Sequence, residues 1–272
     1  MVLSAHVSRC PRYASATSVV LTLALLIGAS GCRSNATVVN DAQTRELARS
    51  MQVQLLRSLE AEKRAVLAST VDDAAKFSQE SRAAAEALNA DRQLLLTLLQ
   101  TQGTPQEQEV LKAFNQTWAR VQTIDAQLLA LAVEKTNLRA SRLATHEALD
   151  ELQALVALLE PAAAIAALKI HVLLPGHIAS AEDQEMTALE GDMAALRKQV
   201  DAALLKKADP TSGAHWQQYV AHLDEIIRLS RRNSNVTSLQ LSMHEKRDAA
   251  KACELAMNAL LEELDRRPKA SR

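Results

Sequence analysis

The sequence predicts an all-α protein built from long amphipathic helices, and three observations lead to this class. Only six Gly and six Pro occur among 272 residues, and aromatic residues make up 2% of the chain, whereas β-sheets need turn residues and β-branched or aromatic faces. Apolar residues recur at spacings of three and four, and two segments 98 residues apart are similar. The net charge of −1 and the shortage of aromatic residues disfavour a nucleic-acid-binding surface.

Residues 1–31 have the features of a secretory signal peptide. Two arginines and no acidic residue precede the apolar run 18–27, which is half as long as the roughly 20 residues that span a membrane. The segment Ala29-Ser30-Gly31-Cys32 resembles the lipobox of bacterial lipoproteins. This resemblance implies that Cys32 is acylated, for example with palmitate, and becomes the first residue of the mature chain. Several acyl chains would then hold the protein firmly on a membrane.

The residues around the predicted lipid site set the expected location. Arg33 stands where Asp would favour the inner membrane, so we expect the periplasmic face of the outer membrane, and 32–40 as a short tether. A secreted protein and an uncleaved anchor are the alternatives. Because Cys10 would be removed and Cys32 acylated, Cys253 has no partner for an intramolecular disulfide. Its helical context predicts a small buried apolar residue, with an intermolecular disulfide or a thiolate ligand as the alternatives.

Sparse helix breakers divide the remainder of the chain into arms. The segments 103–105 and 209–213 each combine a helix stop, an N-cap residue and a Pro in the first turn. Between them Pro161 and Pro175 compete for the main turn; we place it at Pro161 and treat Pro175 as a kink, and the reverse stays open. Thr70 can cap a new helix within the first arm, so five or six helices are allowed. The predicted arms are 41–102, 105–160, 162–208 and 210–266.

Apolar seams on these arms predict how they pack. In the second arm the seam also carries Lys135 and Arg142, and near the end of the fourth arm it consists of Ala250, Cys253, Met257, Leu260 and Leu264. Helices of this length cannot bury such stripes alone. We therefore predict an antiparallel four-helix bundle, or two stacked bundles. In the third arm the seam runs through Met186, Leu189, Met193, Leu196, Val200 and Leu204.

A shift of 98 residues aligns two parts of the chain. It superimposes 131–138 on 229–236, and it places Trp118 on Trp216, the two tryptophans of the sequence. The coincidence predicts that a helical hairpin was duplicated. The expected organisation is a first hairpin at 41–160, a second and repeated hairpin at 161–267, and a tail at 268–272.

Polar residues interrupt the apolar seams at equivalent places in the two repeats. Polar groups inside a bundle cost several kcal/mol unless they find partners. One hypothesis is a pocket in which amide and cationic side chains hold a small ligand, such as a carboxylate. The other is a self-satisfied asparagine layer that fixes the helix register, with the cations extending to solvent. The residues in question are Lys135, Asn137, Arg142, Asn233, Asn235 and Arg247.

Enzymatic and metal motifs are not found in the sequence. His171 and His177 flank the Pro175-Gly176 break and are weak metal candidates, but the Glu-x-x-His pair of di-iron bundles does not occur. No haem motif, Gly-rich phosphate loop or Ser-His-Asp pattern is recognisable. We therefore expect a protein that is not an enzyme and has no cofactor.

One family resemblance emerges from the helical region. The segments 62–68, 114–118 and 128–144 resemble the four-helix-bundle sensor domain of methyl-accepting chemotaxis receptors, and 229–241 is similar to a divergent second copy. The total size is similar to that of helical bimodular sensors, in which two bundles stack. The resemblance implies a periplasmic module that senses small organic acids or amino acids. A second membrane helix and a cytoplasmic signalling hairpin are not recognised, so signalling would need a partner.

Two functions from different classes remain open. The first is a lipid-tethered ligand-binding or sensory accessory module. The second is a structural or adaptor lipoprotein that pairs through its long seams with itself or with another envelope protein.

Overall fold

The computed structural model describes the backbone of residues 28–207 and 209–267, and the side chains within these ranges from Asn40 onward. Every regular element in the described residues is helical, which confirms the predicted all-α class. Most of the predicted signal peptide, and all of the tail at 268–272, lie outside the described residues. Cys32 lies in the described backbone, but its side chain does not belong to the described part.

The helices follow one another with short connections. In chain order they are α1 (Gly28–Leu67), α2 (Val71–Gln102), α3 (Pro105–Glu134), α4 (Thr136–Thr145), α5 (Glu147–Val156), α6 (Pro161–Ala179), α7 (Asp183–Lys207), α8 (Pro210–Arg232), α9 (Ser234–Leu241), the π-helical turn η1 (Ser242–Lys246) and α10 (Arg247–Asp265).

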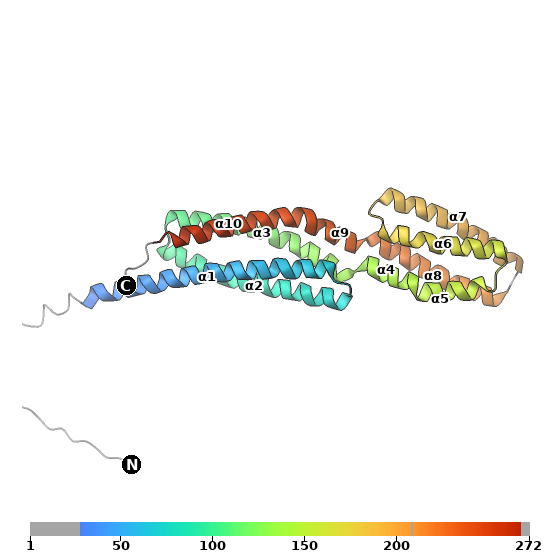
Figure 1. Cartoon of the computed structure of the whole chain (residues 1–272), viewed down its shortest axis with the longest axis horizontal. Coiled ribbons are helices and arrows are strands. Elements are labelled where there is room, and N and C mark those ends of the chain that lie inside the picture. The colour runs from blue at the N-terminus through green and yellow to red at the C-terminus, as the bar shows by residue number, and fades with distance from the viewer. Residues whose placement is uncertain (1–27, 208, 268–272) are drawn as a thin grey trace, which may run out of the picture.

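Two groups of helices enclose separate cores and lie end to end (Figure 1). The first module contains α1, α2, α3, α9, η1 and α10, and the second contains α4 to α8. Leu88, Phe114 and Trp118 are buried in the first core, and Ile170, Tyr219 and Leu223 in the second. The start of α1 and the end of α10 lie at the same outer end of the first module.

Helix α1 begins earlier than the sequence indicated. We predicted a tether at 32–40 and a helix from residue 41, but the backbone is helical from Gly28, so the predicted start of the helix is wrong. The reason is the absence of a breaker: no Pro, and no Gly after Gly31, interrupts the residues that lead into the amphipathic helix.

The predicted caps form at three helix starts. Thr70 accepts a hydrogen bond from the Asp73 amide and begins α2, which divides the first arm as foreseen. Thr104 and Glu107 form a reciprocal capping box at the start of α3, and Asp209 caps α8 through the Ser212 amide. Local sequence therefore determines where these helices begin.

The third predicted arm is two helices. Pro161 is the first residue of α6 and Pro175 lies inside the same helix, which confirms the preferred placement of the turn. The arm then breaks at a second turn that we did not predict. There the Ser180 hydroxyl accepts from the Glu182 amide and donates to the Glu185 carboxylate at 2.5 Å, which favours a turn before the acidic start of α7.

The second and fourth arms also break at a residue with left-handed backbone, and the second arm breaks again at His146, between α4 and α5. Lys135 has φ 46° and separates α3 from α4, and Asn233 has φ 49° and separates α8 from α9. These residues are 98 positions apart, so the breaks occupy equivalent places in the two repeats. These two breaks lie at the boundary between the modules, so each long arm passes from one module into the other (Figure 1).

The repeat units and the spatial modules are therefore different divisions of the chain. The repeat boundary at 160/161 falls between α5 and α6, inside the second module. Each module takes three helices from one repeat and completes its core with the last part of the other repeat's long arm.

The predicted seams are largely buried, with one correction. Cys253, Met257 and Leu260 line the first core, which confirms Cys253 as a buried residue; burial raises the pKa of its thiol to about 11. Arg142 does not lie on the seam and is exposed. The break at Lys135 changes the helix register, so that small residues at 140, 144 and 148 face the second core instead.

Candidate functional site

Residues that share the 98-residue spacing meet at the junction of the two modules. The backbone N–H of Thr136 donates to the hydroxyl oxygen of Ser234 at 3.0 Å. In return, the backbone N–H of Ser234 donates to the hydroxyl oxygen of Thr136, also at 3.0 Å. The backbone N–H of Asn137 donates to Oδ1 of Asn235 at 3.1 Å, and the backbone N–H of Asn235 donates to Oδ1 of Asn137 at 3.2 Å. Equivalent residues of the repeats thus bind each other reciprocally, as around a local twofold axis.

The same junction caps the ends of two neighbouring helices. Lys135 Nζ is buried and donates to the carbonyl of Val66 in the last turn of α1 at 2.7 Å. A cation at this end of a helix is favoured by the helix dipole. Asn233 Nδ2 donates to the Ser180 carbonyl at 3.1 Å, at the end of α6. Each left-handed residue therefore caps the first helix of its own repeat.

These bonds decide what the asparagine layer can do. Asn137 Nδ2 donates to the carbonyl of Ile178 and to Oδ1 of Asn233, both at 2.7 Å, so every polar atom of the Asn137 side chain has a partner. Burial lowers the pKa of Lys135, whose ammonium has Val66 as its described partner. The geometry is that of a register-fixing layer, and we do not place a ligand there.

The six candidate ligand residues do not form one cluster. Lys135, Asn137, Asn233 and Asn235 meet at the junction, whereas Arg142 lies exposed on α4. The sixth, Arg247, is exposed on α10, where Nε donates to Asp248 at 3.2 Å.

The two histidines considered for metal binding have different surroundings. His177 is buried, with Nδ1 2.8 Å from the Ser230 hydroxyl and Nε2 2.8 Å from the Glu190 carboxylate. His171 packs 6.2 Å from the ring of Tyr219, and burial lowers its pKa. Within the described residues, no three His, Cys, Asp or Glu side chains are grouped so as to hold a metal ion.

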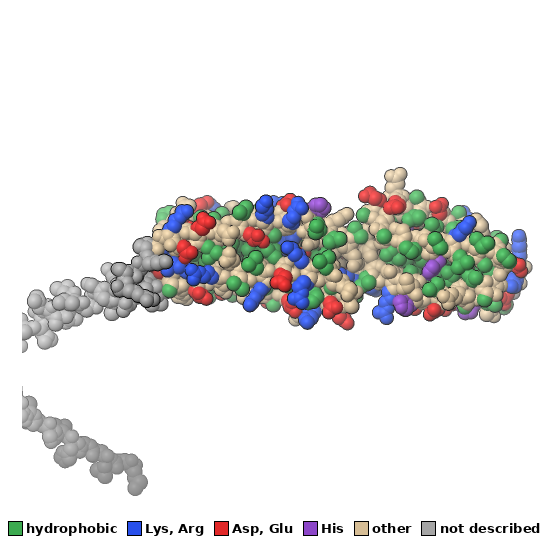
Figure 2. All heavy atoms as spheres, viewed as in Figure 1, with side chains coloured by type: hydrophobic (Ala, Val, Ile, Leu, Met, Phe, Trp, Pro, Cys, Tyr) green, Lys and Arg blue, Asp and Glu red, His purple; other side chains and the backbone are tan. Residues whose placement is uncertain are grey.

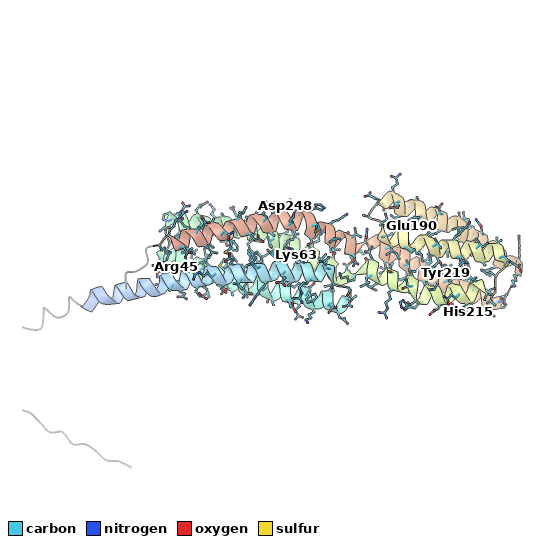
Figure 3. The ribbon with its side chains drawn as sticks, in the orientation of Figure 1. Arg45, Lys63, Glu190, His215, Tyr219 and Asp248 are labelled. Atoms are coloured by element: carbon cyan, nitrogen blue, oxygen red, sulfur yellow. The ribbon has the colours of Figure 1, made fainter. Side chains whose placement is uncertain are left out.

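A cavity opens instead between α1 and the η1–α10 segment, near the junction end of the first module. Its volume is about 350 Å³. Lys63 on α1 and Asp248 on α10 mark the two helices that bound it in Figure 3, and Figure 2 shows Lys and Arg side chains gathered on this part of the surface. We call it the α1–α10 cavity. Its apolar walls are Leu59, Val66, Leu67, Leu239, Met243 and Ala250.

Glu62 contributes a buried carboxylate to this cavity. The side chain is 0% exposed, and neither Oε1 nor Oε2 has a hydrogen-bond partner in the described structure. Burial raises the pKa of Glu62, while the Ser242 hydroxyl and the Lys246 ammonium oppose that rise. A buried carboxylate without partners is costly to the fold, which makes Glu62 a candidate for recognition of a ligand.

A buried ion pair lies beside Glu62. Lys246 Nζ bonds to Oδ1 of Asp125, which reaches across from α3. Burial raises the pKa of Asp125, and the nearby Lys246 lowers it in part. In the described structure Lys246 forms no hydrogen bond or ion pair with Glu62 and acts on it only through its nearby charge.

The backbone at the cavity has π-helical geometry from Ser242 to Lys246. A π-helical turn adds one residue to a helix and often occurs at functional sites. Here it belongs to the segment that presents Ser242, Met243 and Lys246 to the cavity.

Of the residues predicted from the sequence to bind a ligand, Arg247 lines this cavity; Glu62 was not predicted, although a signal was present. Glu62 falls between the buried Leu59 and Val66, and Asp125 between the buried Val121 and Leu128, so both acids occupy apolar seams. The predicted ligand residues were cations and amides of the seams, and none of them was an acid.

Comparison with known proteins adds no family: no protein-family model, no curated protein and no solved structure matches the chain.

Proposed function

We propose that the protein is a lipid-tethered, periplasmic module that binds a small ligand and serves as a sensory accessory. In this proposal each module is an antiparallel four-helix bundle, and the two bundles stack as in helical bimodular sensors. Acylated Cys32 would hold the start of α1 at a membrane, the outer membrane by preference. The second module then projects away from the lipid, since it lies beyond the far end of the first (Figure 1).

The α1–α10 cavity carries this proposal. It combines apolar walls with a buried carboxylate that has no partner in the described structure, which is the composition of a small-ligand site. The junction next to it is held by reciprocal hydrogen bonds and connects α1 with both long arms. A ligand that draws α1 and α10 together would therefore act on the helices that enter this junction.

A thermal-shift screen of the full-length protein in detergent tests the proposal. Small organic acids, amino acids and amines form the panel. A ligand at 100 times its Kd adds about 2.7 kcal/mol to the free energy of unfolding, which raises Tm measurably. Filling the cavity with Ala250→Leu should remove the shift. A panel without any shift contradicts ligand binding.

The lipid anchor has its own test. We expect radiolabelled palmitate to enter the protein expressed in a Gram-negative host, and Cys32→Ala to abolish both labelling and membrane fractionation. Labelling that persists in the variant contradicts acylation at Cys32.

A structural or adaptor role is the second candidate, favoured by one surface. Ile165, Leu168 and Val172 are exposed at helical spacing on α6, which is also the helix in the described residues with the length and hydropathy of a membrane span. The opposite face of α6 is buried in the second core. Sedimentation velocity distinguishes this role: an adaptor that pairs with itself forms oligomers that Val172→Glu disperses.

A further inference from the structure

We propose that the α1–α10 cavity recognises a small zwitterion, an amino acid whose ammonium group pairs with the Glu62 carboxylate. This inference rests on the proposed function and adds the chemical class of the ligand. It starts from Glu62, the buried acid whose two oxygens have no partner in the described structure.

The Glu62 carboxylate indicates that the ligand carries a positive group. A carboxylate is only an acceptor when ionised, so it requires a donor, and a charged donor forms the strongest bond. Lys246 is bonded to Asp125, the Ser242 hydroxyl near Glu62 is uncharged, and no charged side chain of the described structure bonds to the Glu62 oxygens. An ammonium group from a ligand fulfils the requirement.

The negative end follows from the charges around the rest of the cavity. Three exposed cations line it, Lys63, Arg247 and Lys251, and they outnumber the one exposed acid of the lining, Glu254. Lys63 and Lys251 take part in no ion pair of the described structure. A simple amine would meet repulsion from these cations, whereas a ligand carboxylate beside them is attracted. One positive and one negative group on the same ligand satisfy both parts of the site.

The middle of the ligand is set by the walls and the volume. The apolar side chains of Leu59, Met243 and Ala250 suit a short hydrocarbon segment. A cavity of about 350 Å³ is at the small end of ligand sites, which excludes a bulky peptide.

Binding should release a proton. Burial raises the pKa of Glu62, with Lys246 from η1, Asp125 from α3 and neighbouring Lys63 as the charged groups that act on it. A ligand ammonium stabilises the carboxylate and lowers this pKa again. Part of the protein population therefore loses a proton from Glu62 on binding, in the pH range where the free side chain is partly protonated.

Isothermal titration calorimetry on the full-length protein in detergent, with three probes of matched size, tests the inference. These are 4-aminobutyrate, butylamine and butyrate. We expect 4-aminobutyrate to bind more tightly than either single-charge probe, and Glu62→Gln to weaken it by at least about tenfold. The binding enthalpy should also vary with the ionisation enthalpy of the buffer, which reports the released proton. Glu60→Gln, the same change at an exposed site on α1, should have no effect.

The outcomes separate the inference from the proposed function. If butyrate binds most tightly, or if Glu62→Gln binds 4-aminobutyrate as tightly as the parent protein does, the cavity does not recognise a zwitterion through Glu62. Either result still agrees with a ligand site at the cavity. If no probe binds and the wider panel gives no thermal shift, the proposed function fails as well. Unchanged helicity by circular dichroism in Glu62→Gln ensures that lost binding is not lost folding.

Discussion

At the scale of single residues, a few polar side chains determine where the long helices break at the junction of the modules. Asn233 tolerates left-handed backbone better than most residues, because its short side chain can satisfy nearby groups, whereas Lys135 has no such preference. Lys135 offsets the cost through its bond to the end of α1. Each of these two helix breaks is thus held in place by a hydrogen bond to the end of another helix.

The break at Asn233 gives the first prediction. Asn233→Gly tolerates the left-handed backbone but loses the hydrogen bonds to Asn137 and Ser180. Asn233→Ala loses the same two hydrogen bonds and also disfavours the left-handed backbone. We expect Ala to be less stable than Gly by about 1 kcal/mol, and Gly to be less stable than the parent protein. Urea denaturation followed by circular dichroism measures this order. Equal stability of the two variants contradicts a role for the backbone geometry.

Glu62 gives the second prediction. Below about pH 4.5, its ordinary pKa, the side chain is protonated in both the folded and unfolded states. Above that pH the unfolded chain ionises while burial keeps the proton on the folded protein, so the free energy of unfolding falls as pH rises through this window. Glu62→Gln removes the effect. In the absence of ligand we expect it to be more stable at pH 8 by about 1–3 kcal/mol, with the advantage lost at pH 4.

At the scale of elements, helix starts and helix breaks are controlled differently. The start of α3 is fixed by its own residues, since Thr104 and Glu107 complete a capping box. Glu107 is also held from the end of the chain, where Arg267 bonds both its oxygens and reaches Asp41 on α1 at 2.5 Å. A local cap thus also connects α3 with Asp41 of α1 and with Arg267, two residues beyond the end of α10.

This cluster gives the third prediction. Burial raises the pKa of Glu107, but the bonds from Arg267 and Thr104 outweigh it and lower the pKa overall. Its contribution to stability is therefore present above pH 4.5 and lost as pH falls through the folded-state pKa. We expect Thr104→Ala to cost about 1 kcal/mol and Glu107→Gln about 1–3 kcal/mol at pH 7.

Thermal melts across pH check these values. The Glu107→Gln difference should shrink towards pH 3, the opposite trend to Glu62→Gln. A pH-independent loss would show that the charge of Glu107 is not what stabilises the cluster.

At the scale of the whole molecule, two repeats exchange their last helices to make two modules. The second module has a continuous core of its own, drawn from α4 to α8. The hydrogen bonds between 136–137 and 234–235 connect the two modules at their junction. The arrangement predicts a module that folds when separated at the two left-handed residues.

The fourth prediction concerns that fragment. Residues 135–233, expressed alone, should be helical and unfold in one cooperative transition, because the core of the second module lies within these limits. The control is 161–267, the second repeat, which lacks α4 and α5 and should be less stable. Differential scanning calorimetry measures the unfolding transition of both fragments. If fragment 135–233 shows no cooperative transition, the second module does not fold independently.

Much of the local structure was predictable from the sequence because it depends on neighbouring residues. Thr70, Thr104 and Asp209 cap helices as their spacing indicated, and Pro161 begins α6. The turn at Ser180 was missed although its serine and acidic residues were visible. The breaks at Lys135 and Asn233 were not predicted, since no Pro or Gly marks them and contacts with α1 and α6 stabilise them.

The sequence by itself determined the helical class, several helix starts and the similarity of two segments 98 residues apart, since propensity, capping and similarity are properties of short segments. Only the tertiary structure decided that equivalent residues of the repeats contact each other, and that the asparagines are satisfied there. It also placed Glu62 beside the Lys246–Asp125 pair in one cavity. The physical reason is that burial, partners and cavity shape depend on residues distant in the chain, which a pattern along one helix does not contain.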